Sequence, residues 1–147
     1  MSISRQNLSV VIVSYISEEV IHKCIESIPK DINILVVDNS GNEEFKLSIE
    51  EKYINAKCIL SFENLGMGAG NNLGLKNSLT DFALIINPDV VLENDTIDEM
   101  INASKEIESF AVIAPIIKSG INVNYKLFDE NKNKENSINP FKVKSVD

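Results

Sequence analysis

The 147-residue chain has few of the residue types on which several common classes of protein depend. It contains no tryptophan, two cysteines and one histidine, and Arg5 is its only arginine. Because the net charge is −8, a basic face that follows a phosphate backbone is not expected, and nucleic-acid binding is disfavoured. The single histidine, His22, is expected to face solvent on a helix, so neither a Ser-His-Asp triad nor a histidine-rich metal site is predicted.

Long apolar runs are lacking as well. The runs FALII and AVIAPII are far shorter than the ~20 residues that a membrane-spanning helix needs, and the start of the chain lacks the apolar segment of a signal peptide. We therefore expect a cytoplasmic protein without a transmembrane segment. Cys24 and Cys58 lie in apolar segments without C-x-x-C spacing, so we predict both as small core residues.

Strand-like and helix-like segments alternate along residues 1–117. Apolar runs predict strands at 8–15, 32–38, 56–62, 82–89 and 110–115. Helical spacing of apolar residues predicts helices at 17–28 and 43–53, a short helix from the glycine-rich stretch to about Leu79, and another that begins at Asn94 or Asp95. This order predicts an α/β fold with a Rossmann-like, mostly parallel sheet and helices on both of its faces.

The composition changes after this part. Residues 1–117 carry a net charge of −10, whereas residues 118–147 carry +2 and are rich in asparagine and lysine with little apolar periodicity. We predict an α/β domain over 1–117, followed by a polar extension over 118–147.

The stretch ENLGMGAGNNLG, residues 63–74, contains four of the six glycines. Its spacing does not match the dinucleotide fingerprint G-x-G-x-x-G, whether counted from Gly66 or from Gly68, and a Walker lysine is missing. Two interpretations stay open: a tight turn with close packing of a helix on the sheet, or backbone N–H groups offered to an anion. Asn64, Asn71 and Asn72 favour neutral hydrogen bonding over charge neutralisation.

Polar residues follow the predicted strands, and ligands of parallel sheets bind beyond the carboxyl ends of the strands. Asp38 and Asp89 could each be a turn former or a helix cap. Alternatively, one could accept a hydrogen bond from a base or a sugar, and the other could hold Mg²⁺ or Mn²⁺ between phosphates. Asp89 suits the metal role because it lies at the very end of the predicted strand 82–89. The residues at the strand ends are Ser14, Tyr15, Asp38, Asn39, Glu63, Asn64, Asn87 and Asp89.

Four pieces of the sequence carry a resemblance to a known family. They are VVIVSYISEEVIHKCIESI, ILVVDNS, ENLGMGAGNNLGLKNS and ALIINPDVVLENDTIDEMI, within roughly residues 8–117. In this order and spacing they resemble the nucleotide-sugar half of bacterial family-2-type glycosyltransferases with the GT-A fold, most closely the rhamnosyltransferase-like members. The resemblance implies an incomplete GT-A fold, the N-terminal part of a longer enzyme.

The resemblance also implies roles for residues at the strand ends. It places the nucleotide base at Ser14, Tyr15 and Asp38. It places the nucleotide sugar against the asparagine-glycine loop, at Asn64, Gly66 and Asn72.

The metal motif of the family, usually D-x-D, corresponds to Asn87-Pro88-Asp89, with Asp89 as the metal ligand and Asn87 beside the nucleotide sugar. The sequence departs from the family twice here, because Asn87 replaces the first acid and Ile16 stands where asparagine is common.

The activity that the resemblance implies is transfer of a sugar, with inversion, from a UDP- or dTDP-sugar to a glycan or lipid-linked acceptor. It further implies Mg²⁺ or Mn²⁺ as cofactor, a role in bacterial surface polysaccharide synthesis, and a general base beyond Asp147. Peripheral attachment to the inner membrane and a homodimer stay open. So do two alternatives: a non-catalytic nucleotide-binding or partner-binding domain, and a Rossmann-type oxidoreductase, which the lack of glycines after the first strand disfavours.

Overall fold

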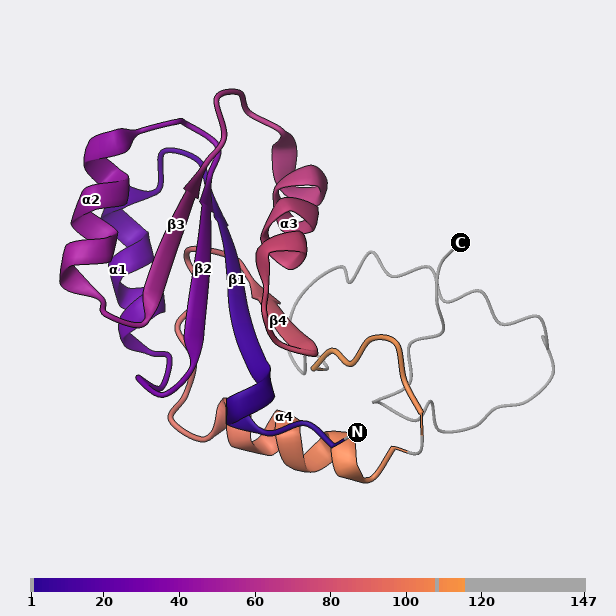
Figure 1. Cartoon of the computed structure of the whole chain (residues 1–147). Helices are drawn as coiled ribbons and strands as arrows, with labels where there is room; N and C mark the ends of the chain where they lie inside the picture. The colour runs from indigo at the N-terminus through magenta and orange to yellow at the C-terminus, as the bar shows by residue number, and fades with distance from the viewer. Residues whose placement is uncertain (1, 108, 116–147) are drawn as a thin grey trace, which may run out of the picture. The chain divides into compact units, whose positions relative to one another are not determined.

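The computed structural model describes residues 2–107 and 109–115, in which strands and helices alternate (Figure 1). A short 3-10 turn at Arg5–Asn7 precedes the first strand. The order predicted from the sequence is confirmed as far as the fourth helix. The strands are β1 (Leu8–Ser14), β2 (Asn33–Asp38), β3 (Ala56–Leu60) and β4 (Phe82–Ile86). The helices are α1 (Glu18–Glu26), α2 (Glu43–Lys52), α3 (Gly66–Asn77) and α4 (Thr96–Lys105).

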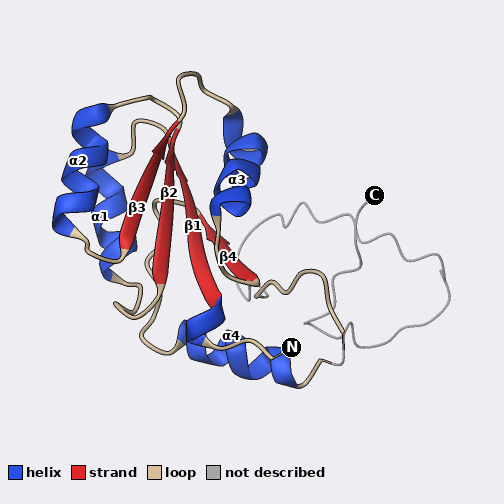
Figure 2. Ribbon diagram, viewed as in Figure 1, coloured by secondary structure: helices blue, strands red, loops and turns tan. Residues whose placement is uncertain are grey.

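The four strands form one parallel sheet in the order β3-β2-β1-β4 (Figure 2). β1 is central, and its Val10 pairs with Ile34 of β2 on one side and with Leu84 of β4 on the other. Consecutive parallel strands need a crossover connection, which α1, α2 and α3 provide. The predicted α/β fold with a parallel sheet is therefore confirmed.

Helices cover both faces of the sheet, with α1 and α2 on one face and α3 on the other (Figure 1). Side chains alternate along a strand, so Val10 and Ile12 of β1 join the core under α1 and α2, while Val11 and Val13 face α3. Because both faces are covered, β1 is apolar at five of its seven positions, with serine at the other two. Other members of the larger core are Ile21, Ile25, Ile34, Val36, Phe45, Ile49, Ile97 and Ile101.

Cys24 and Cys58 are free and buried, which confirms their predicted place in the core. Burial raises the pKa of the Cys24 thiol to about 11, and the negative charge of Asp89 adds to the rise. Burial likewise raises the pKa of Cys58 to about 12, with smaller contributions from nearby carboxylates. Both side chains are therefore protonated at neutral pH and poor nucleophiles.

The prediction that His22 faces solvent is wrong. Its ring is half-buried on α1, and its Nδ1 lies 2.9 Å from the hydroxyl oxygen of Tyr53, which follows α2. The Tyr53 hydroxyl in turn donates a hydrogen bond to Glu26 at 2.9 Å. Side chains at the C-terminal end of α2 thus contact α1, and Tyr53 covers part of the histidine ring.

The chain divides into a compact unit up to Ile101 and a second unit that begins at Asn102. The prediction of a strand over 110–115 is wrong, because only Val112 makes an isolated bridge pairing in this segment. An apolar run becomes a strand only where it pairs along its length and one side is buried, and Val112 is 55% exposed. The predicted extension over 118–147 lies outside the described residues. Within the described residues, the structure contains no helix of the length and apolarity that crossing a membrane requires.

Candidate functional site

Polar residues gather at the carboxyl edge of the sheet. Because the strands are parallel, their carboxyl ends share this edge, and Ser14 of β1 lies directly opposite Asp38 of β2. Both side chains are buried, with 1% of their surface exposed. Two polar side chains that the sequence separates by a whole helix are thus adjacent, under the loops where ligands of such sheets bind.

Asp38 organises the turn that follows β2. Its carboxylate accepts hydrogen bonds from the Ser40 hydroxyl at 2.8 and 2.9 Å, from the Ser40 N–H at 3.2 Å and from the Asn42 N–H at 2.9 Å. Asn42 then caps α2 by accepting a hydrogen bond from Phe45 N–H at 3.1 Å. The turn-former interpretation of Asp38 is therefore confirmed, while its contact with a nucleotide base stays a prediction.

Two buried polar atoms beside Asp38 have no hydrogen-bond partner among the described residues. They are Oγ of Ser14 and Oδ1 of Asn39, the latter in a side chain that is 3% exposed. A buried polar atom without a partner is rare and costs roughly 1–3 kcal/mol, so its persistence calls for a ligand, a water molecule or another explanation.

The turn after β1 is strained. Ile16 has φ +52°, a left-handed conformation that β-branched residues rarely adopt, and its side chain is 69% exposed. The Ser17 hydroxyl holds the turn by donating to the carbonyl of Tyr15 at 3.2 Å and accepting from its N–H at 3.4 Å. Asparagine tolerates this conformation much better than isoleucine. Tyr15, half-exposed, lies on the same turn.

The glycine-rich stretch begins with an asparagine turn. Gly66 has φ +73°, and its N–H donates to Oδ1 of Asn64 at 2.9 Å, an Asx-turn that starts α3. The Asn39 side chain donates from below to the Gly66 carbonyl at 3.2 Å and to Oδ1 of Asn64 at 3.5 Å. Asn64 and Gly66, which the sequence predicted as site residues, are thus linked to the end of β2.

The other glycines of α3 differ in how closely the sheet approaches them. A Cβ on Gly74 would lie 2.5 Å from Cγ1 of Val11, and one on Gly70 would lie 2.9 Å from Cγ1 of Val13. A Cβ on Gly68 would meet nothing within 4 Å. The packing interpretation is therefore confirmed for Gly70 and Gly74, which let the helix lie close against the sheet.

No side-chain hydrogen bond within the described chain links Asn72 to the other predicted site residues. It is exposed and lies two positions after Gly70, which faces the sheet. Two positions along an α-helix rotate a side chain by about 200°, so Asn72 lies on the side of α3 away from the sheet. Its contact with a nucleotide sugar stays a prediction.

Asp89 lies in a β-turn after β4. The Val90 N–H donates to the Asn87 carbonyl at 3.2 Å, which places Pro88 and Asp89 at the two central positions of the turn. Proline favours the first of these positions because its φ is already suitable. The side chains of Asn87 and Asp89 are exposed, and Asp89 makes no hydrogen bond or ion pair with the described residues.

Hydrogen bonds from the C-terminal end of α1 support this turn. The Cys24 thiol donates to the Asn87 carbonyl at 3.5 Å, and the Ser27 hydroxyl accepts from the N–H of Leu92 at 3.0 Å while donating to the Cys24 carbonyl at 2.7 Å. The segment that carries Asp89 is thus attached to the helix at both of its ends.

The oxygen atoms at this turn suit a hard divalent cation. Mg²⁺ and Mn²⁺ are commonly held by one or two carboxylates together with phosphate oxygens of the substrate. Asp89, which has no partner among the described residues, could be such a carboxylate. No group of three or more His, Cys, Asp or Glu side chains that could hold a metal occurs within residues 2–107 and 109–115. A metal at Asp89 would therefore depend on ligand oxygens as well as on the protein.

Comparison with known proteins decides the family. The sequence pattern of "Glycosyl transferase family 2" matches residues 9–145. The chain belongs to this family. One relative, the low-salt glycan biosynthesis hexosyltransferase Agl10 of Haloferax volcanii, is 32% identical over 124 residues. That match covers 80% of this chain but 39% of the relative, so the chain spans less than half of the relative's length.

Two solved structures have a similar fold. Residues 1–349 of Staphylococcus aureus TarS, in complex with UDP, superpose with a TM-score of 0.62 at 25% identity, over 80% of this chain and 38% of that one. The mannosyltransferase PcManGT of Pyrobaculum calidifontis, in complex with GDP-Man and Mn²⁺, gives a TM-score of 0.60 at 17% identity, over 75% and 34%. The predicted GT-A type of fold and membership of family 2 are therefore confirmed.

Sequence reasoning gave no role to several residues that organise the site. Asn39 was grouped with the strand ends, but its hydrogen bonds to the glycine loop depend on the path of a segment 25 residues away. Ser40 completes the Asp38 turn, and a signal for it existed in the short Asp-Asn-Ser-Gly sequence, which is typical of turns. The side chains of Cys24 and Ser27 support the Asp89 turn by hydrogen bonds to backbone atoms of Asn87 and Leu92, which no side-chain pattern reveals.

Proposed function

We propose that this chain is the donor-binding part of a glycosyltransferase that transfers a sugar from a UDP- or dTDP-sugar to an acceptor hydroxyl with inversion. The observation that carries the proposal is the carboxyl edge of the sheet. Ser14 and Asp38 are the last residues of β1 and β2 at this edge, and the turn that contains Asp89 follows β4 there. The family match supports the reaction class. The UDP bound by TarS and the GDP-Man and Mn²⁺ bound by PcManGT support a nucleotide sugar and a divalent metal as ligands.

Each part of the edge has a proposed task. Ser14 and Asp38, with the exposed ring of Tyr15, take the nucleotide base, and the partnerless Ser14 hydroxyl gains a hydrogen bond there. Asn64, Gly66, Asn72 and Asn87 line the diphosphate and the sugar. Asp89 holds Mg²⁺ or Mn²⁺. When bound, the metal neutralises charge that develops on the diphosphate leaving group.

The acceptor and the general base belong to the proposal only at the level of class. The glycan-synthesis relative supports a glycan or lipid-linked acceptor, and the general base is proposed to lie outside the donor-binding part. The Rossmann oxidoreductase is not favoured, because the glycine stretch follows β3 and its tight positions, Gly70 and Gly74, contact the sheet.

The test is a calorimetric titration of the chain with UDP and with dTDP, each with and without Mn²⁺. We expect binding that Mn²⁺ strengthens, and we expect Asp89→Ala to abolish the Mn²⁺-dependent part. Asp81→Ala is the matched control, because Asp81 is an exposed acid just before β4, at the opposite end of the same strand. Absence of binding by the unaltered chain, or undiminished Mn²⁺ dependence in Asp89→Ala, would contradict the proposal.

A further inference from the structure

The glycine loop is attached to the sheet by a closed network of hydrogen bonds that begins at Asn39. This residue directly follows β2 and is 3% exposed. Its Nδ2 donates to the Gly66 carbonyl at 3.2 Å and to Oδ1 of Asn64 at 3.5 Å, and the same Oδ1 accepts the Gly66 N–H at 2.9 Å. The amide lies beside Gly70, where a Cβ would be in ordinary van der Waals contact with Nδ2 of Asn39, at 3.4 Å.

The backbone of Gly66 determines which way both asparagine amides are turned. An N–H can only donate, so the Asn64 atom that faces it is the carbonyl oxygen. A carbonyl can only accept, so the Asn39 atom that faces it is the amide nitrogen. Because its oxygen is used twice inside the loop, Asn64 offers its Nδ2 as the remaining group. That side chain is exposed, and the nitrogen has no hydrogen-bond partner among the described residues.

Asn39 keeps this arrangement although its own oxygen is buried without a partner among the described residues. An apolar residue of similar size would not bury such an atom. The hydrogen bonds from its nitrogen are therefore what distinguishes asparagine from an apolar residue at this position. They hold the start of α3, where N–H groups and the helix dipole favour an anion.

We propose that Asn39 is a positioning residue that fixes Asn64 as a hydrogen-bond donor to a diphosphate oxygen of the bound nucleotide. The inference rests on the proposed function, because it specifies the polarity of one contact in the same site. Asn64 then recognises an acceptor oxygen and cannot serve a donor group such as a ring N–H. Asn39 acts only through Asn64 and Gly66.

The first experiment compares three isosteric changes by titration with UDP, dTDP and uridine in the presence of Mn²⁺. Asn64→Asp keeps the acceptor for Gly66 and Asn39 but removes the donor, so we expect an unchanged unfolding midpoint and at least tenfold weaker UDP binding. Asn39→Asp sets oxygen against the Gly66 carbonyl and should weaken UDP binding to a similar extent. Neither change should alter the affinity for uridine, which has no diphosphate.

Asn55→Asp is the matched control. Asn55 donates to the Ile32 carbonyl at 2.8 Å, a comparable amide-to-backbone hydrogen bond at the amino edge of the sheet. We expect Asn55→Asp to lower the melting temperature without changing the affinity for UDP. A loss of UDP affinity in this control equal to that in Asn39→Asp would overturn the positioning role.

The second experiment tests whether Asn39 acts through Asn64. A double variant, Asn39→Ala with Asn64→Ala, should bind UDP as weakly as Asn64→Ala alone, because the losses of binding free energy at coupled residues are not additive. Fully additive losses would overturn the proposal, as would Asn64→Asp that binds UDP normally, whether or not any Asn39 variant folds. An unaltered chain that binds neither UDP nor dTDP would instead show that the proposed function itself fails.

Discussion

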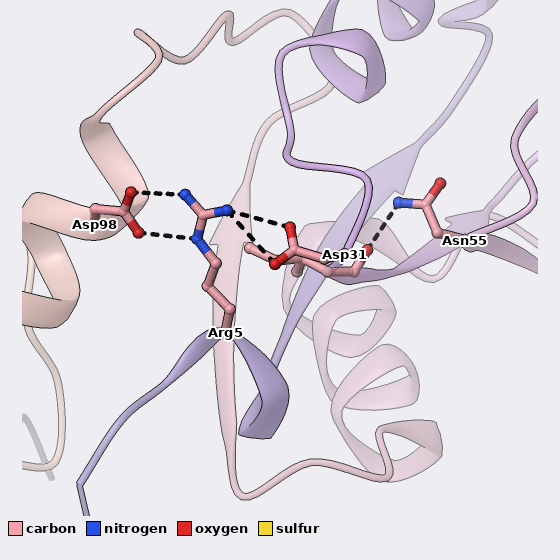
Figure 3. Close-up of polar contacts among 5 residues, drawn as sticks. Arg5, Asp31, Asn55 and Asp98 are labelled. Carbon is pink, nitrogen blue, oxygen red and sulfur yellow. Dashed lines mark hydrogen bonds and ion pairs between the residues drawn. The ribbon is translucent and has the colours of Figure 1, made fainter.

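The two edges of the parallel sheet differ in how their polar side chains are paired. At the amino edge, Arg5 forms a bidentate ion pair with Asp98, in which its Nε and Nη2 lie 2.9 and 2.6 Å from the carboxylate oxygens (Figure 3). Its Nη1 donates to Oδ1 of Asp31 at 3.2 Å. Asn55 donates to the Ile32 carbonyl close by. At the carboxyl edge, two buried polar atoms and an exposed carboxylate have no partner among the described residues.

This difference sets a stabilising amino edge apart from the carboxyl edge, where the proposed binding site lies. Polar groups that pair with one another contribute to the free energy of folding, whereas buried groups that stay unpaired reduce it. Strain follows the same division, because Ile16, at φ +52°, also lies at the carboxyl edge. Strained and unsatisfied groups cluster at functional sites, where a ligand can compensate for them.

Asp38 is the exception that could break the comparison, because it lies at the carboxyl edge and is fully paired. We expect Asp38→Ala to lower the free energy of unfolding by about 3 kcal/mol, since it removes hydrogen bonds to a charged group from Ser40 and Asn42. Urea unfolding at pH 7 measures this loss. Asp31→Ala, at the amino edge, should cost much less because Asp31 is exposed. Equal losses in the two variants would contradict the account.

Gly68 and Gly74 show how α3 changes from an open start to tight packing against the sheet. Gly74→Ala should lower the free energy of unfolding by about 2 kcal/mol, because the new methyl group would overlap Val11. Gly68→Ala should raise it by about 0.5–1 kcal/mol, because alanine is the better helix former and the position is open. Thermal unfolding distinguishes the two variants. A change of the same sign in both would show that α3 does not approach the sheet more closely at Gly74 than at Gly68.

Ser9 and Ser14 are a matched pair on β1, with 2% and 1% of their surfaces exposed. At the amino edge, the Ser9 hydroxyl accepts a hydrogen bond from Thr80 at 2.8 Å. Ser9→Ala should therefore lower the free energy of unfolding by about 1 kcal/mol, while Ser14→Ala should raise it by about 1 kcal/mol by removing an unpaired hydroxyl. Chemical denaturation without ligand is the measurement. If Ser14→Ala destabilises the chain as much as Ser9→Ala, the hydroxyl is paired in solution.

Ile16→Asn gives the smallest expected effect. Asparagine tolerates the left-handed backbone, so the substitution should raise the free energy of unfolding by about 0.5 kcal/mol. Val20→Asn, on the exposed side of α1, is the control and should not stabilise the chain. A melting temperature that rises for both variants would point to a general gain from removing exposed apolar residues and not to relief of strain.

Much of the fold could be predicted because its signals are local. β1 and β2 are buried on both faces and therefore read as continuous apolar runs, and proline and asparagine mark where helices end or begin. The segment 110–115 has the same apolar appearance but forms no strand. Pairing with a neighbour decides between the two outcomes, and a single segment does not contain that information.

The site could be predicted only as a set of strand ends. Parallel strands bring Ser14 and Asp38 to one edge, which follows from topology alone. The direction of each side chain depends on backbone conformations such as the left-handed Gly41 and Gly66, and on the approach of α3. For that reason the sequence suggested a ligand role for Asn64 but gave no indication that Asn39 holds it.

The most direct test of the account is amide hydrogen exchange of the whole chain with and without UDP and Mn²⁺. If the carboxyl edge binds the nucleotide, exchange should slow in residues 14–17, 38–42 and 64–70. Exchange around Arg5, Asp31 and Asn55, at the amino edge, should stay the same. Slowing at the amino edge, or at neither edge while UDP is bound, would contradict the central claim that the unpaired edge of the sheet is the binding site.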